Sequence, residues 1–132
     1  MKTALLVAAF TSAFLSSASA APHHSFAATY DPSGTMQIEG RIVQFQFRNP
    51  HSFVHVEAPD EQGEMRRWAV EWGGTGQLGS QGVTGATLSP GDEVTIIGTP
   101  GRNREDYRLL MRSLRRESDG FGWGQDPDEV FD

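Results

Sequence analysis

Two runs of alternating apolar and polar residues meet at Asn49-Pro50, and this junction constrains the fold more than any other part of the sequence. The runs cover residues 35–47 and residues 51–58. Alternation with a period of two predicts a half-buried β-strand. An Asn-Pro pair favours a turn and disfavours helical backbone at Asn49, so the two runs are expected to be separate strands. We therefore expect the chain to open its fold with a β-meander.

Three further segments have strand-like composition, namely residues 65–72, 93–98 and 107–114. The last of these fits a helical spacing as well, and its context favours a strand. Between the third and fourth strands, residues 73–87 are rich in glycine, which predicts a loop with about one helical turn. Three strands, an irregular connection and two strands is the order of an OB barrel. We predict an all-β fold, a small five-stranded OB-like barrel with a short irregular or helical cap between strands 3 and 4.

The ends of the chain differ in composition from the middle. An apolar run over residues 4–15 is followed by the small residues Ala18-Ser19-Ala20, a pattern typical of a secretory signal peptide and its cleavage site. We therefore expect residues 1–20 to be a signal peptide and the mature protein to be periplasmic or secreted. Residues 21–116 are expected to form the OB-like β-barrel domain with an N-terminal, histidine-containing arm. Residues 117–132 carry six acidic residues and no basic residue, and we expect a mostly disordered tail there.

The composition excludes several classes of protein. The chain has no cysteine, so neither disulfides nor a cysteine-linked lipid anchor is available to it. It has 17 acidic and 11 basic residues and a formal net charge of −6 at pH 7, which disfavours nucleic acid as a partner. The apolar run near the N-terminus is shorter than the ~20 residues that a membrane span needs. We expect no nucleic-acid partner and no membrane span.

The strongest chemical hypothesis is a metal site for copper or zinc, because imidazole suits both metals. The candidate ligands are the four histidines of the chain, His23, His24, His51 and His55. His51 and His55 are four residues apart on one predicted strand, which separates their backbones by about 13 Å. Convergence on one ion therefore requires the arm that carries His23 and His24 to reach His51. Asp31 or Glu57 is expected to orient an imidazole through its second nitrogen.

Several short motifs together resemble a family of small exported bacterial proteins that is classed as a domain of unknown function. The motifs are His23-His24-Ser25-Phe26, Tyr30-Asp31, Asn49-Pro50-His51, Trp68 and Pro90-Gly91-Asp92. The resemblance covers about residues 21–116, implies export, and supplies no activity. The chain departs from the family pattern in residues 73–87, where relatives are more helical, and in its acidic extension.

Two alternatives to a metal site remain open. In the first, the histidines are structural and the protein is a binding or interaction module, whose ligand is a small molecule or an envelope protein. Barrels of this type bind ligands on their second and third strands, so Phe53 and Trp72 are the candidate ligand-binding residues. In the second, the protein is a hydrolase that uses Ser25, His24 and Asp31. No nucleophile-elbow motif accompanies these residues, and we therefore predict no catalytic residue and a protein that is not an enzyme.

Overall fold

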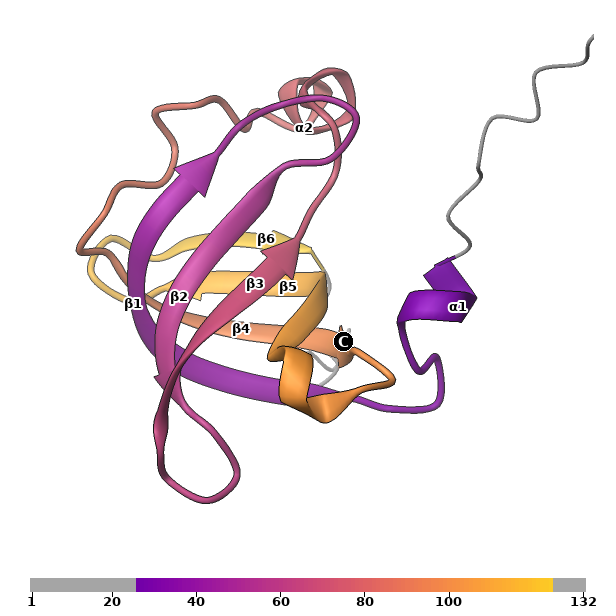
Figure 1. Ribbon diagram of the computed structural model, residues 1–132. Helices are drawn as coiled ribbons and strands as arrows, with labels where there is room; N and C mark the ends of the chain where they lie inside the picture. Colours follow the sequence, from indigo (N-terminus) through magenta and orange to yellow (C-terminus); the bar gives the residue numbers. More distant parts are fainter. Residues whose placement is uncertain (1–25, 125–132) are drawn as a thin grey trace, which may run out of the picture.

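The structure is a computed structural model, and it describes residues 26–124 of the chain (Figure 1). The six strands are β1 (Met36–Gln46), β2 (Phe53–Pro59), β3 (Met65–Glu71), β4 (Glu93–Pro100), β5 (Arg108–Arg116) and β6 (Phe121–Gly124). The helical segments are short: α1 (Phe26–Thr29), α2 (Thr75–Ser80) and the single 3-10 turn η1 (Arg104–Asp106). No helix within residues 26–124 is long and apolar enough to cross a membrane.

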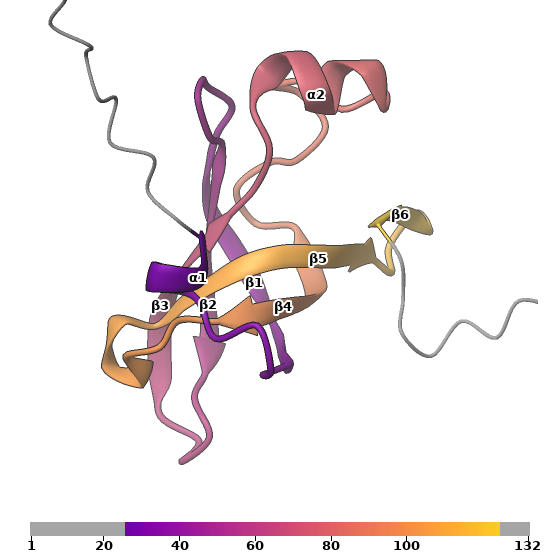
Figure 2. The same cartoon turned by 90° about the vertical axis from the view of Figure 1, so that its right-hand side faces the viewer.

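The strands form one sheet that closes on itself. Their order is β3-β2-β1-β4-β5-β6, and a parallel pairing between β3 and β5 joins the two halves into a five-stranded barrel. The segment between β3 and β4 includes α2, which lies over one end of the barrel in both ribbon views (Figures 1 and 2). Side chains that alternate along each strand fill the interior; Val54, Val56 and Val70 have no exposed surface. The predicted all-β, five-stranded OB-like barrel with a short cap between strands 3 and 4 is confirmed.

A bulge in β1 explains which of its residues face the core. The pairing of β1 with β2 shifts register between Ile42 and Gln44. Before the bulge the even-numbered Ile38 and Ile42 are buried, and after it the odd-numbered Phe45 packs against the core. The extra residue at a bulge reverses the side-chain alternation that follows it. One long strand can therefore supply both parts of the barrel wall.

The C-terminal residues differ from the sequence-based expectation. We expected residues 117–132 to be mostly disordered, but residues 121–124 form β6, which pairs with the second half of β5. Phe121 and Trp123 turn inward and pack against the core, and this burial stabilises a strand that has glycine at every other position. Residues 125–132 lie outside the described residues. The sheet consequently has a sixth strand at its edge (Figure 2).

The N-terminal segment is fixed to the outside of the barrel. In both ribbon views α1 lies beside the start of β5 (Figures 1 and 2). Arg102 donates from Nε to the carbonyl oxygen of Ala27 at 2.7 Å, and Tyr30 forms an isolated β-bridge with Gly101. The amide of Asp31 donates to the carbonyl of Pro100 at 2.9 Å. These bonds hold residues 27–31 against the connection between β4 and β5.

Candidate functional site

The carboxylate of Glu71, the last residue of β3, is the centre of a polar cluster on the outer face of the barrel. Its Oε1 accepts a hydrogen bond from Nδ1 of His51 at 2.9 Å. Its Oε2 accepts from the hydroxyl of Tyr30 and from Nη2 of Arg108 at 3.1 Å. Arg108 also donates from Nε to the Tyr30 hydroxyl at 3.0 Å. We call these four residues, Tyr30, His51, Glu71 and Arg108, the Glu71 cluster.

The Glu71 cluster is buried although Glu71 points outward from the barrel. Alternation along β3 turns Val70 into the core and Glu71 to the outside, where Tyr30 and Arg108 cover it. Glu71 is only 8% exposed, and Tyr30 only 2%. Burial, together with the hydrogen bond to Glu71, raises the pKa of the Tyr30 phenol above its ordinary value. Tyr30 therefore remains a neutral donor, and the N-terminal segment covers a carboxylate that would otherwise face water.

The hydrogen bond from His51 to Glu71 determines what the imidazole can do. An ionised carboxylate only accepts hydrogen bonds, so Nδ1 of His51 carries the proton. In the neutral ring, Nε2 then has a free lone pair. No hydrogen bond from Nε2 to any part of residues 26–124 is present. His51 thus has one nitrogen fixed by the protein and one nitrogen available to a ligand.

A groove lies beside this imidazole. It has a volume of about 440 Å³, and His51, Phe26, Trp72 and Met111 are among the residues that line it. The ring of Phe26 lies 5.5 Å from the ring of His51, centroid to centroid, and 47% of Phe26 is exposed. Except for His51 and Gln77, the side chains of the lining are apolar. A ligand of His51 would therefore sit between an imidazole and an apolar wall.

His55 is in a different environment from His51, although both lie on the outer face. Its ring stacks on Phe53 with centroids 6.3 Å apart. Burial lowers the pKa of His55, and the nearby charges of Arg67 and Arg48 lower it further. His55 therefore contacts neither Glu71 nor the groove, as the four-residue separation on one strand predicts.

The remaining predicted site residues are placed as follows. Phe53 lies on the outer face, with the guanidinium carbons of Arg48 and Arg108 at 5.4 Å and 5.6 Å from its ring centre. Trp72 is only 3% exposed, packs edge-on against Trp123, and lines the groove. Its indole N–H is buried and has no acceptor within residues 26–124. His23 and His24 lie outside the described residues, as does Ser25 of the hydrolase alternative.

Within residues 26–124, neither of the acidic residues that we expected to orient an imidazole, Asp31 and Glu57, is hydrogen-bonded to His51 or His55. The carboxylate of Asp31 accepts from the amide and hydroxyl of Ser33 in a local turn, and Glu57 is exposed on β2. Glu71 has this role instead. The sequence gives one indication of it, because an acidic residue that ends a strand of buried side chains needs a partner. The partners of Glu71 are distant in the sequence and meet it only in the closed barrel, so the residues around Glu71 do not predict them.

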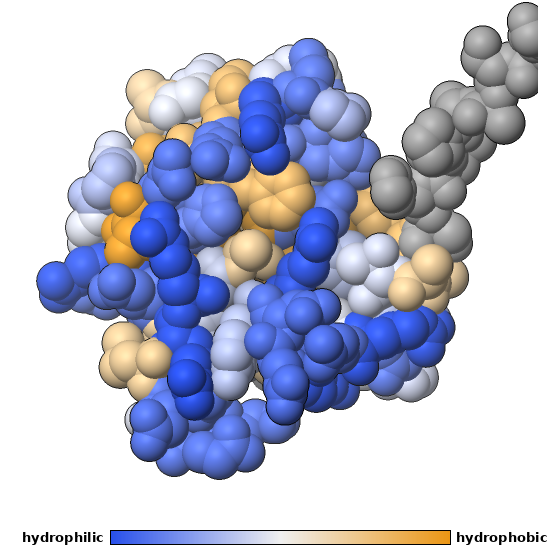
Figure 3. Space-filling model, viewed as in Figure 1, coloured by the Kyte–Doolittle hydropathy of each residue, from blue (hydrophilic) through white to orange (hydrophobic). Residues whose placement is uncertain are grey.

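In residues 26–124, no group of three or more histidine, cysteine, aspartate and glutamate side chains is arranged to hold a metal ion. A site that uses three imidazoles therefore requires His23 and His24. The face of the molecule seen in Figure 3 is mostly hydrophilic, with apolar side chains in separate spots rather than in one continuous patch. An extended apolar partner is not indicated on this face.

The comparisons with known proteins identify a family and no activity. A model described as a family of unknown function (DUF6152) matches residues 12–109, so the match begins before α1 and ends in β5. Neither the curated proteins nor the solved structures include a significant match to this chain. Because the model covers well over half of the sequence, the chain belongs to the DUF6152 family, a family of unknown function.

Proposed function

We propose that this protein is a small exported module that binds copper or zinc, and that it is not an enzyme. The proposed ligands are Nε2 of His51 and the imidazoles of His23 and His24. The site lies at the groove between Phe26 and Trp72. A coordination position left to water or to a small molecule would face the groove.

The hydrogen bond between Glu71 and His51 carries this proposal. Histidine ligands of metals characteristically donate their second ring nitrogen to a carboxylate or a carbonyl, which fixes the ring and increases its basicity. Glu71 provides this support to His51 at 2.9 Å. Tyr30 and Arg108 fix the Glu71 carboxylate in turn. The imidazole is therefore held in one orientation before any ligand arrives.

The position of Phe26 brings the remaining ligands within reach. Phe26 contacts His51, and His24 precedes Phe26 by two residues, a separation of at most about 7 Å of extended chain. Tyr30 and Ala27 anchor the same segment to the barrel. The length of chain between His24 and Phe26 therefore permits the proposed coordination with His51. We leave His55 out of the proposed site because its ring stacks on Phe53 instead.

Export is a second part of the proposal and rests on the sequence of residues 1–20. Their apolar run and small residues before Ala21 have the pattern of a signal peptide. Cleavage there would leave His23 and His24 within four residues of the mature N-terminus. Mass spectrometry of the protein from the periplasm and the medium tests this part, and a full-length cytoplasmic protein would contradict it.

Calorimetric titration with Cu²⁺ and Zn²⁺ tests the metal site. Wild-type protein is compared with the variants His51→Ala, Glu71→Gln and His55→Ala. We expect His51→Ala to weaken binding by at least about tenfold and Glu71→Gln by about 10- to 100-fold, because second-sphere carboxylates have effects of that size. His55→Ala is the matched control, with the same residue type on the same face, and should bind like wild type.

The outcome that contradicts the metal site is equal binding by the wild-type protein and His51→Ala. Thermal unfolding of each variant without metal separates a lost ligand from a lost fold. A double variant, His23→Ala with His24→Ala, should weaken binding without changing the unfolding temperature, since neither residue lies within the described barrel.

A second candidate function is favoured by the size of the groove beside His51. Its volume of about 440 Å³ lies within the range of about 300 to 1,000 Å³ that is usual for small-molecule sites. In this alternative the histidines are structural, and a small ligand or an envelope protein contacts Phe53 or Trp72. Small-molecule binding that Phe26→Ala in the groove weakens, and that is indifferent to metal chelation, would favour this candidate.

A further inference from the structure

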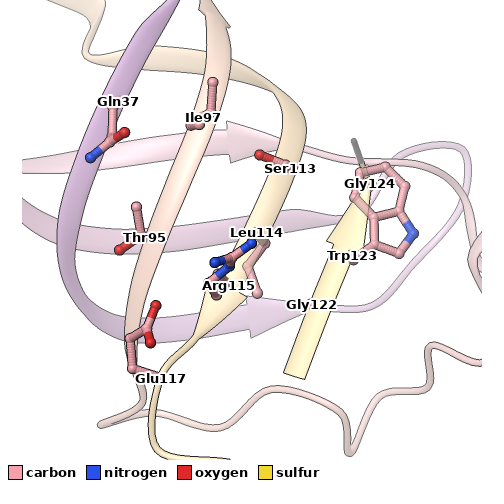
Figure 4. Close-up of a pocket in the computed structure, with 10 residues that line it drawn as sticks. All are labelled: Gln37, Thr95, Ile97, Ser113, Leu114, Arg115, Glu117, Gly122, Trp123 and Gly124. Carbon is pink, nitrogen blue, oxygen red and sulfur yellow. The ribbon is translucent and has the colours of Figure 1, made fainter. Parts of the chain in front are cut away.

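A second groove lies on the outer face formed by β1, β4, β5 and β6, and it has a volume of about 350 Å³ (Figure 4). Figure 4 shows Gln37, Thr95 and Glu117 on one side of it and Trp123 on the other, with Arg115 between them. His51 and Glu71 do not line it. The groove is therefore distinct from the proposed metal site, apart from Trp123, which lines both.

The strand registers explain why the surface is hollow here. One row across the four strands consists of Gln37, Ile97, Ser113 and Gly124. The next row contains Thr95, Arg115 and Gly122. Because Phe121 and Trp123 turn inward, the outward positions of β6 are both glycines. Two rows of side chains thus end at a strand that has none on this face, and the missing side chains leave the groove.

The lining of the groove combines hydroxyl and amide groups with the apolar Ile97 and with two side chains of opposite charge. Ser113 is only 8% exposed, and neither its hydroxyl nor that of Thr95 is hydrogen-bonded to another group of the described chain. Gln37 donates one amide hydrogen to Glu39 at 2.8 Å, which leaves its carbonyl oxygen to accept. The charged residues of the lining, Arg115 and Glu117, have opposite signs and together add no net charge. The groove therefore offers hydroxyl and amide groups without a net charge.

We propose that this groove binds a short neutral saccharide. Sugar hydroxyls both donate and accept hydrogen bonds, which matches the hydroxyls of Thr95 and Ser113 and the amide of Gln37. The volume of about 350 Å³ is at the small end of the usual range for ligand sites, enough for one or two sugar rings. The one basic and one acidic side chain of the lining, Arg115 and Glu117, cancel, so the groove does not favour a ligand of either net charge.

Glycine 122 provides the test that leaves the barrel intact. A Cβ atom added to Gly122 would approach no atom more closely than the carbonyl oxygen of Leu114, at 4.0 Å. Gly122→Leu therefore fills the groove without a steric conflict in the backbone. Gly124 is unsuitable, because its φ is +80° and a Cβ there would collide with the carbonyl of Arg112. Gly79→Leu on α2 is the matched control, since a Cβ at Gly79 meets nothing within 4 Å.

Nuclear magnetic resonance of the ¹⁵N-labelled protein, titrated with maltose, cellobiose and diacetylchitobiose, measures the binding. We expect at least one disaccharide to shift the amide signals of Thr95, Ser113 and Gly122 with a millimolar dissociation constant. Gly122→Leu should abolish the shifts, and Gly79→Leu should keep them. Thr95→Val combined with Ser113→Ala should weaken binding at least about tenfold, because two hydrogen bonds are lost.

Two results would overturn the proposal. One is the absence of shifts at these residues with every disaccharide. The other is a set of shifts that Gly122→Leu leaves unchanged, because the sugar would then bind elsewhere. Co-sedimentation with insoluble cellulose and chitin distinguishes a free disaccharide from a polysaccharide chain as the source of the sugar. Retention that Gly122→Leu removes would support the polysaccharide as the source.

Discussion

Two ionic clusters that each contain an arginine hold distant parts of this protein together, and they differ in what they leave unbonded. The Glu71 cluster joins the N-terminal segment, β3 and β5. The second, which we call the Arg116 cluster, consists of Thr87, Asp92, Arg116 and Asp119. Arg116 donates to the carbonyl of Thr87 at 2.8 Å, to Asp92 at 2.7 Å, and to both carboxylate oxygens of Asp119 at 3.0 Å and 2.8 Å. Every nitrogen of that guanidinium is bonded within the protein.

The difference between the clusters lies in burial and in the histidine. Asp119 has 54% of its side chain exposed, whereas Glu71 has 11%. In the Arg116 cluster, the hydrogen bonds of the arginine all go to acceptors of the protein. The Arg116 cluster therefore only holds the β5–β6 connection against the segment that leads into β4. The Glu71 cluster includes His51, whose Nε2 has no partner within the described residues. The Glu71 cluster can therefore bind a ligand through the second ring nitrogen of its histidine, whereas the Arg116 cluster has no such group.

Removal of the Glu71 carboxylate should have the largest effect on stability. Glu71→Ala leaves the donors of Tyr30, His51 and Arg108 without their common acceptor. We expect the free energy of unfolding to fall by about 3 kcal/mol, as it does when one partner of a buried ion pair is removed. Urea denaturation measures it. Glu57→Ala, at an exposed position on β2, is the control and should change the value by less than about 0.5 kcal/mol.

A loss below about 1 kcal/mol for Glu71→Ala would mean that the Glu71 cluster resembles an exposed ion pair. The comparison between the two clusters would then fail.

Removal of the Arg116 guanidinium should have a smaller effect. Arg116→Ala deletes four hydrogen bonds, but its partner Asp119 is largely exposed and can be hydrated. We expect a loss of about 1.5 kcal/mol, between the values for exposed ion pairs and for charged hydrogen bonds. The same urea denaturation applies, and Arg104→Ala on the exposed η1 is the control. A larger loss than that of Glu71→Ala would reverse the ranking.

The smallest expected effect is a pH dependence that originates at Asp119. Hydrogen bonds from Arg116 lower the pKa of Asp119 from 3.8 to about 2. Its contribution to stability is therefore complete above the unfolded pKa, near 4, and is lost as the pH falls toward 2. Carbon-13 NMR of the Asp119 carboxyl group measures the pKa directly. In Arg116→Ala the pKa should return toward its ordinary value, and an unchanged low pKa would contradict the assignment.

The strands that alternate in sequence could be predicted, since alternation and turn residues are local signals. Residues 35–47, 51–58 and 93–98 correspond to β1, β2 and β4, with ends that differ by a few residues. The strand at Phe121–Gly124 could not, because two glycines in four residues have little strand propensity and β6 exists through its pairing with β5. The bulge of β1, between Ile42 and Gln44, likewise has no local signal in the sequence.

Gly40 has a role that alternation does not reveal. A Cβ atom there would collide with the carbonyl oxygen of Glu57 on β2, so glycine permits the two backbones to approach. For the candidate site, the position of His51 after a turn was visible in the sequence. The partner of His51, Glu71, could not be predicted. Glu71 is held by Tyr30 and Arg108, which are 41 and 37 residues away in the sequence and meet it only when β3 pairs with β5.

The most direct test of this account is the tautomer of His51, because the proposed site depends on a proton held at Nδ1 and a lone pair at Nε2. Long-range ¹H–¹⁵N correlation NMR distinguishes the two nitrogens in the neutral ring, at a pH well above the ordinary histidine value of about 6.5. We predict that Nδ1 of His51 is protonated and that Glu71→Gln shifts its resonance, while His55 is unaffected by that substitution. A proton found on Nε2 of His51 would show that Glu71 does not hold the imidazole, and would contradict the proposed site.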